Sequence, residues 1–201
     1  PDSKDTSGLS SPDNQSVSPA VVGNYEVTGR EVSGYTISYD PKSGSLSKDA
    51  SLTLRVIYTR DTGDLNVITE LAGGGTLPGG SGWDLTAPSD FSGSPSGKDT
   101  GGLASGDDQT VSPAVTGSYS VTGRAVNGYI ISYDPKNGTL VKDGSLTLKV
   151  IYTRAEGDTL IVVTELVGGG TLPSGSGWDL TSTPNGFSGT PSSKDTSGLA
   201  S

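Results

Sequence analysis

Hydrophobic and polar residues alternate along two neighbouring stretches of the chain, 52–59 and 65–71. Every second residue in the first stretch is aliphatic or aromatic, and the second stretch keeps this alternation with one threonine among its apolar positions. A period of two is typical of a β-strand that buries one face. The segment between them, Asp61-Thr-Gly-Asp64, has the composition of a turn. The pattern therefore predicts a β-hairpin, and a second one over 146–152 and 160–166.

Shorter alternating segments lie upstream, at 25–28 and 35–39, and carry the β-branched and aromatic residues that favour strands. Turn sequences containing Pro and Gly follow at 40–44 and 134–138. No segment keeps a period of 3.6, and Gly or Pro interrupts every candidate helix. The chain is therefore predicted to be mainly β, with at most one short helical turn in each unit.

The same pattern occurs twice along the chain. Val56-Ile-Tyr-Thr-Arg60 returns as Val150-Ile-Tyr-Thr-Arg154, at an offset of 94 residues. Trp83 returns as Trp178 at an offset of 95, because Thr159 is inserted in a loop. A repeat of this length is typical of an array in which neighbouring units stack and bury surface together. The neighbouring repeats of the same chain are therefore expected partners.

A third copy begins near the end of the chain, because the Lys-Asp-Thr segment at 3–9 returns at 97–103 and again at 193–199. Together with Pro at position 1, this predicts a piece cut from a longer array. Each unit also contains two related β half-motifs, one with Tyr25 or Tyr119 and one with Trp83 or Trp178. The predicted domains are unit 1 (3–96), unit 2 (97–192) and the start of a third unit (193–201).

Composition narrows the functional classes. Hydrophobic residues make up 30% of the chain, and the formal net charge is -9, with 13 basic and 22 acidic residues. The basic residues do not cluster, so no nucleic-acid partner is expected. No apolar run is long enough to insert this segment into a membrane. Small ordered domains with long polar loops, kept soluble by their acidity, fit these numbers best.

Candidate chemistry is sparse. The chain has no His and no Cys, which excludes a Ser-His-Asp triad, a thiol nucleophile and a His/Cys metal cluster. Asp84 and Asp179 follow the tryptophans and could resemble a glycosidase pair, but solvated or capping carboxylates are far more common there. Asp61 and Asp64 offer oxygen ligands for calcium without the spacing of a known calcium loop. The prediction is therefore a protein without enzyme activity, cofactor or metal site.

Four segments of the second unit carry a family resemblance: Ser118-Tyr-Ser-Val-Thr122, Asn127-Gly-Tyr129, Asn137-Gly-Thr-Leu140 and Leu148-Lys-Val-Ile-Tyr152. This order resembles the MucBP-type repeats, and related tandem repeats, of Gram-positive cell-wall-anchored surface adhesins. The Gly-rich segment at 73–82 departs from that pattern. The resemblance implies a β-grasp-like fold, with a β-sandwich as the alternative. It also implies an extracellular position on a bacterial cell surface, anchored through another part of the parent protein.

The resemblance implies a non-enzymatic segment that acts in adhesion and as an extended stalk. A purely structural stalk or self-associating fibre, and a carbohydrate-binding accessory domain, are the alternatives. If the segment binds a host glycan or glycoprotein, the expected ligand-binding residues are Trp83, Trp178, Tyr39 and Tyr133, since aromatic rings stack on sugars. The competing interpretation is that these side chains fill small cores, which aromatic residues dominate.

Overall fold

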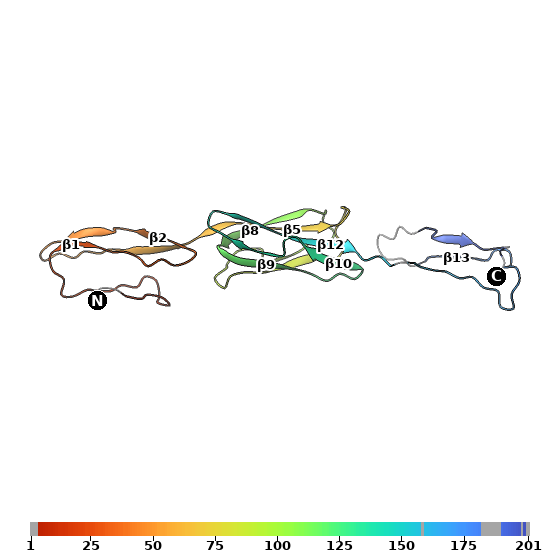
Figure 1. The fold of residues 1–201 in the computed structure, drawn as a ribbon, viewed down its shortest axis with the longest axis horizontal. Coiled ribbons are helices and arrows are strands. Elements are labelled where there is room, and N and C mark those ends of the chain that lie inside the picture. Colours follow the sequence, from red (N-terminus) through yellow and green to blue (C-terminus); the bar gives the residue numbers. More distant parts are fainter. Residues whose placement is uncertain (1–3, 158, 182–189, 198, 200–201) are drawn as a thin grey trace.

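The structure, a computed structural model of the 201-residue chain, describes residues 4–157, 159–181, 190–197 and 199. Three β-rich parts follow one another along the long axis (Figure 1). The described residues form strands, turns and loops without a helix, which confirms the prediction of a mainly β protein. Accordingly, no membrane-spanning helix occurs among them.

The central part, residues 62–154, is a two-layer β-sandwich. Its first sheet has the strand order β10-β12-β5-β8, and its second sheet has the order β11-β9-β6-β7. A β-grasp-like arrangement, in which a helix packs on a sheet, is not found there, because this part has no helix. The eight strands are β5 (Thr62–Leu71), β6 (Gly82–Thr86), β7 (Gly97–Asp99), β8 (Asp107–Val115), β9 (Gly117–Gly123), β10 (Tyr129–Tyr133), β11 (Asn137–Leu140) and β12 (Ser145–Arg154).

The hydrophobic core lies between these two sheets. On β5 and β12, the alternation seen in the sequence points every second side chain into the core, as a pleated strand requires. The second sheet contributes Trp83 from β6 and Tyr119 from β9, both fully enclosed. The buried cluster comprises Leu65, Val67, Leu77, Trp83, Val111, Ala114, Tyr119, Val121, Leu140, Leu148, Val150 and Tyr152.

The two strands predicted to form a hairpin do not pair with each other. Strand β4 (Val56–Arg60) pairs with β2 (Tyr35–Tyr39), and β5 begins one residue later, in the next domain. There β5 lies parallel to β12 and antiparallel to β8. The hairpin prediction is wrong because a turn-like composition describes only local preference. Between β12 and β8, strand β5 has hydrogen-bonded neighbours at both edges, whereas a hairpin would give it only one.

The folded domain is out of phase with the sequence repeat. Strands β5 and β6 come from unit 1 (3–96), whereas β8 to β12 come from unit 2 (97–192). A sequence period has no natural starting point, so units of this length can be drawn from any residue. Each sandwich is therefore built from the second part of one unit and the first part of the next.

The outer parts each resemble one portion of the central sandwich. In the N-terminal part, β1 (Gly23–Glu26) pairs with β3 (Ser43–Leu46) and β2 pairs with β4, as β9 pairs with β11 and β10 with β12. In the C-terminal part, β13 (Gly177–Asp179) pairs with β14 (Ser193–Asp195), as β6 pairs with β7.

Replacing Leu148 by Ala tests the limits of the central domain. Leu148 is fully buried between the sheets, so its loss should lower the free energy of unfolding by about 2–5 kcal/mol. The matched control is Leu54→Ala, the repeat equivalent in the half-buried N-terminal part. It should leave the central domain unchanged. Urea unfolding followed by Trp83 fluorescence, in a Trp178→Phe background, measures both; equal effects would contradict these limits.

Candidate functional site

The four aromatic residues expected to bind a ligand lie in three different parts of the chain. Trp83 is fully buried in the central core, and Trp178 is half-buried on β13. Tyr133 lies on the other sheet of the central domain from Trp83, and Tyr39 lies on β2. The four side chains therefore do not form one site, and their role in ligand binding stays a prediction.

Tyr39 and Tyr133 make the same structural contacts in their two repeats. The Tyr39 hydroxyl accepts a hydrogen bond from the Gly29 amide at 3.1 Å, and Tyr133 accepts one from Gly123 at 3.2 Å. A lysine ammonium lies over each ring, 5.4 Å from the Tyr39 centroid and 4.9 Å from the Tyr133 centroid. Both rings therefore tie neighbouring strands of one sheet to a loop, which is a packing role.

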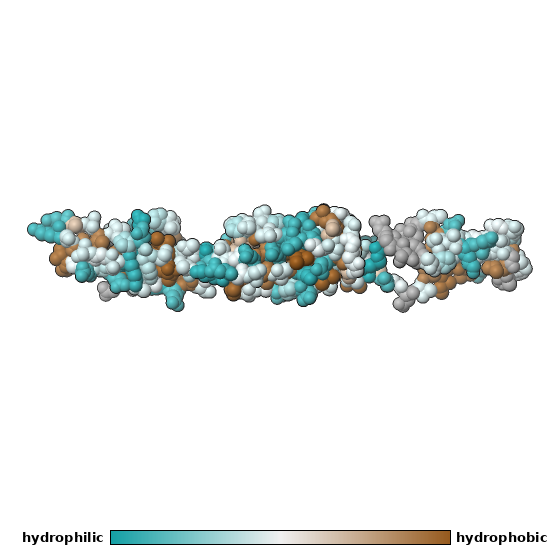
Figure 2. Space-filling view, turned by 90° about the horizontal axis from the view of Figure 1, so that it is seen from above, coloured by the Kyte–Doolittle hydropathy of each residue, from teal (hydrophilic) through white to brown (hydrophobic). Residues whose placement is uncertain are grey.

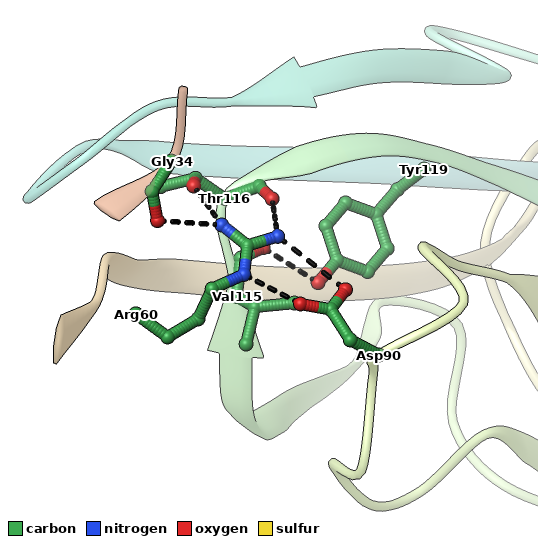
Figure 3. A network of polar contacts seen from close by, with 6 residues as sticks. All are labelled: Gly34, Arg60, Asp90, Val115, Thr116 and Tyr119. Carbon is green, nitrogen blue, oxygen red and sulfur yellow. Dashed lines mark hydrogen bonds and ion pairs between the residues drawn. The ribbon is translucent and has the colours of Figure 1, made fainter. Parts of the chain in front are cut away.

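The densest polar network lies where the N-terminal part meets the central domain, around Arg60 at the end of β4 (Figure 3). Its guanidinium donates to the Gly34 carbonyl at 2.9 Å, on its own side of the joint. On the central-domain side it donates to the Thr116 hydroxyl and carbonyl, both at 2.6 Å. A planar fork of donors suits such a site, because several acceptors are satisfied at once.

Asp90 completes the network from the central domain. Its carboxylate accepts from Nε of Arg60 at 2.6 Å, with a longer contact of 3.4 Å to Nη2. This hydrogen bond holds the pKa of Asp90 below its ordinary value and raises the pKa of Arg60 further. The guanidinium also lies over the Tyr35 ring, 5.2 Å from its centroid. Arg60 is thus held from three directions.

Backbone hydrogen bonds and a second charged contact reinforce the same joint. The Asp61 amide donates to the Gly34 carbonyl at 2.9 Å, and the Thr116 amide donates to the Asp61 carbonyl at 2.9 Å. Lys142 of the central domain donates to the Thr36 hydroxyl at 2.6 Å and lies 3.6 Å from the Asp61 carboxylate. The single residue between β4 and β5 is therefore fixed to both parts.

The second joint repeats the inner half of this arrangement. Arg154 lies over the Tyr129 ring at 5.5 Å and donates to its hydroxyl at 3.1 Å. The Ala155 amide donates to the Gly128 carbonyl at 2.9 Å, as Asp61 does to Gly34. The repeat equivalent of Asp90 is Asn185, which lies outside the described residues.

Sequence reasoning did not identify Arg60. The signal was present, because the strand sequence ends in Arg in both copies, directly before an acidic residue or Ala-Glu. It was assigned to the start of a turn, where an exposed Arg is common. Only the pairing of β5 with β12 reveals that the next residue already belongs to another domain.

The chemistry of the joint is that of a fastening rather than of a catalyst. Its charged groups are paired with each other, and they line an open cleft of about 540 Å³. Asp84, considered as a glycosidase carboxylate, forms an ion pair of 2.9 Å with Arg124 on the domain surface, which lowers its pKa. The described residues contain no group of three metal-binding side chains of the His, Cys, Asp or Glu type.

Comparison with known proteins gives little beyond this geometry. No known family model matches the chain, and no curated protein is significantly similar to it. One similar solved structure is a major pilin protein of Streptococcus pyogenes, with a TM-score of 0.35 and 14% sequence identity. The match covers 69% of this chain and 68% of the pilin chain. A TM-score this low does not establish a shared fold.

Replacing Arg60 by Ala should loosen the joint without unfolding the domain. The chain has no Cys, so spin labels can be attached at Ser45→Cys and Ser132→Cys, both exposed, on either side of the joint. Electron paramagnetic resonance should then show a broader distance distribution for Arg60→Ala. The stability of the central domain should change by less than about 0.5 kcal/mol.

Arg124→Ala is the matched control, because Arg124 pairs with Asp84 inside the central domain. It removes an arginine and an ion pair but should leave the distance distribution as narrow as before. A similar broadening in both variants would show that Arg60 has no particular role at the joint.

Acid should loosen the same joint through Asp90. Because its folded-state pKa is lowered, the stabilising contact is complete above about pH 4 and is lost as the pH falls through the lowered value. The spin-label distance distribution should therefore broaden between about pH 4 and about pH 2. Asp90→Asn should be broader already at neutral pH and should lose this part of the pH dependence; an unchanged acid response in that variant would exclude Asp90 as its source.

Proposed function

We propose that the chain is a section of a rod-like, non-enzymatic stalk of a bacterial cell-surface protein. The observation that carries this proposal is the direct passage of β4 into β5. Strands of five and ten residues follow each other with only Asp61 between them, and each belongs to a different domain. A junction of one residue, fixed on both sides by hydrogen bonds, removes the flexible linker that normally lets domains reorient.

The register of the parallel pair gives the length that each repeat adds. Val150 lies beside Thr69 in the β5–β12 pair, and its repeat equivalent is Val56. Val56 lies thirteen residues before Thr69 on the nearly continuous run of β4 and β5. At ~3.3 Å per residue of strand, one repeat advances the array by about 40 Å. Length would therefore be set by the number of repeats.

Composition supports the same function. A net charge of -9 over 201 residues makes neighbouring rods repel one another and keeps them soluble. The absence of His and Cys removes the commonest catalytic groups. The placement at a Gram-positive cell surface rests on the resemblance of the sequence to MucBP-type repeats. We favour the stalk over an adhesive role for these repeats, because Tyr39, Tyr133 and Trp83 are engaged in packing.

Chains with additional copies of residues 61–154, inserted after Arg154, test the stalk directly. Small-angle X-ray scattering at low protein concentration should show a maximum dimension that increases by about 40 Å with each added copy. A control chain with a Gly-Ser insertion of about six residues after Asp61 should become flexible and lose this regular increase. An increment well below 40 Å, or a compact shape, would contradict a rod.

A further inference from the structure

Both outer parts of the chain expose residues whose repeat equivalents are buried in the central domain. In the N-terminal part, Tyr58 is 38% exposed, whereas its equivalent Tyr152 is 0% exposed. In the C-terminal part, Leu160 is 68% exposed, whereas its equivalent Leu65 is 0% exposed. Figure 2 shows hydrophobic surface on both of these parts. The same amino acids therefore form a core in one place and a surface in two others.

The central domain shows what each outer part lacks. There β5 occupies the middle of a sheet, between β12 and β8. In the N-terminal part, β4 is the equivalent of β12, and no strand of the described chain lies beside it in the position of β5. The N-terminal part thus has an open slot along β4.

The C-terminal part carries the strand that fits this slot. Residues 160–166 match 65–71 of β5 in every core-facing position: Leu160, Val162, Thr164 and Leu166 stand for Leu65, Val67, Thr69 and Leu71. In the described structure, 160–166 belong to no sheet. Val162 is 37% exposed, whereas Val67 is fully buried. The segment is therefore a strand sequence without a strand partner.

Tyr58 also lacks part of its hydrogen-bond set. The hydroxyl of Tyr152 is bonded to the Arg124 carbonyl and to the carbonyl and amide of Gly82, at 2.8, 2.8 and 3.0 Å. The hydroxyl of Tyr58 already donates to the equivalent Arg30 carbonyl at 3.0 Å. The equivalent of Gly82 is Gly177, next to Trp178 on β13 at the other end of the chain.

From these equivalences we infer that the two ends of this chain are complementary, and that a second copy of it is the partner. The segment 160–166 of one copy inserts parallel to β4 of the next, with Val162 beside Leu54 and Leu166 beside Tyr58. This register follows from the pairing of Val67 with Leu148 and of Leu71 with Tyr152 in the central domain. The joined halves form a sandwich equivalent to residues 62–154.

The assembly is open, because each copy presents a slot at one end and a strand at the other (Figure 1). Head-to-tail contacts between unlike surfaces add copies without closing into a ring unless the rod bends. The inference does not depend on the stalk: it concerns contacts between chains, whereas the stalk concerns the spacing of domains within one chain.

Sedimentation and light scattering of the 201-residue chain test the inference between about 1 µM and about 1 mM. The average mass should rise with concentration above the 20.2 kDa of one copy. Amides of residues 160–166 should gain hydrogen-exchange protection over the same range and approach the protection of 65–71. A mass that stays at 20.2 kDa throughout would overturn the inference.

Two neighbouring substitutions separate insertion of the strand from general stickiness. Val162→Asn places an amide on the face that enters the core and should weaken association at least about tenfold. Ile161→Asn makes the same type of change on the opposite face, where the central domain itself has Asn66, and should leave association intact. Equal effects of the two would show that exposed hydrophobic surface, rather than strand insertion, drives the association.

A mixing experiment tests the head-to-tail geometry and does not require any variant to lose its fold. Val162→Asn blocks the strand end, and Tyr58→Asn should block the slot end. Each variant alone should stay close to one copy, whereas their mixture should form pairs and stop there, because only one matching pair of ends remains. Retention of the Trp83 unfolding transition confirms an intact central domain. Growth of the mixture beyond two copies, or no pairing at all, would contradict the inference.

Discussion

The insertion of β5 between β12 and β8 is the contact on which the rest of the structure depends. It joins two stretches of the chain that lie about a repeat apart in sequence, and it places eight residues of β12 in register with β5. Because β5 has neighbours on both edges, its core-facing side chains are removed from water on all sides. Neither half of the sandwich can bury its apolar face alone, which explains why the outer parts expose residues that the central domain hides.

The same insertion determines the joint. Strand β5 must begin where the preceding domain ends, so the chain has no room for a linker between Arg60 and Thr62. Asp61 is consequently held by backbone hydrogen bonds from both sides, and Arg60 reaches across to Thr116 and Asp90. Fold and joint are therefore one feature: the strand that completes a domain is also the strand that aligns it with its neighbour.

Much of the local structure could be predicted from the sequence. The alternation at 52–59 and 65–71 correctly indicated strands and their buried faces, and the turn-rich composition excluded helices. The pairing could not be predicted, because alternation specifies which face of a strand is buried but not which strand lies beside it. A local hairpin and a distant parallel partner satisfy the same pattern. Arg60 was missed for the same reason, since its importance comes from a neighbour 56 residues away.

The parallel register has a mechanical consequence. Within the sandwich, the chain enters at the start of β5 and leaves at the end of β12, and these two points lie at opposite ends of adjacent parallel strands. Tension along the rod therefore pulls the two strands past each other instead of peeling them apart. All the hydrogen bonds of the ladder resist together, so the domain yields only when the whole pair slips. The geometry that sets the spacing of the repeats also makes each of them a shear clamp.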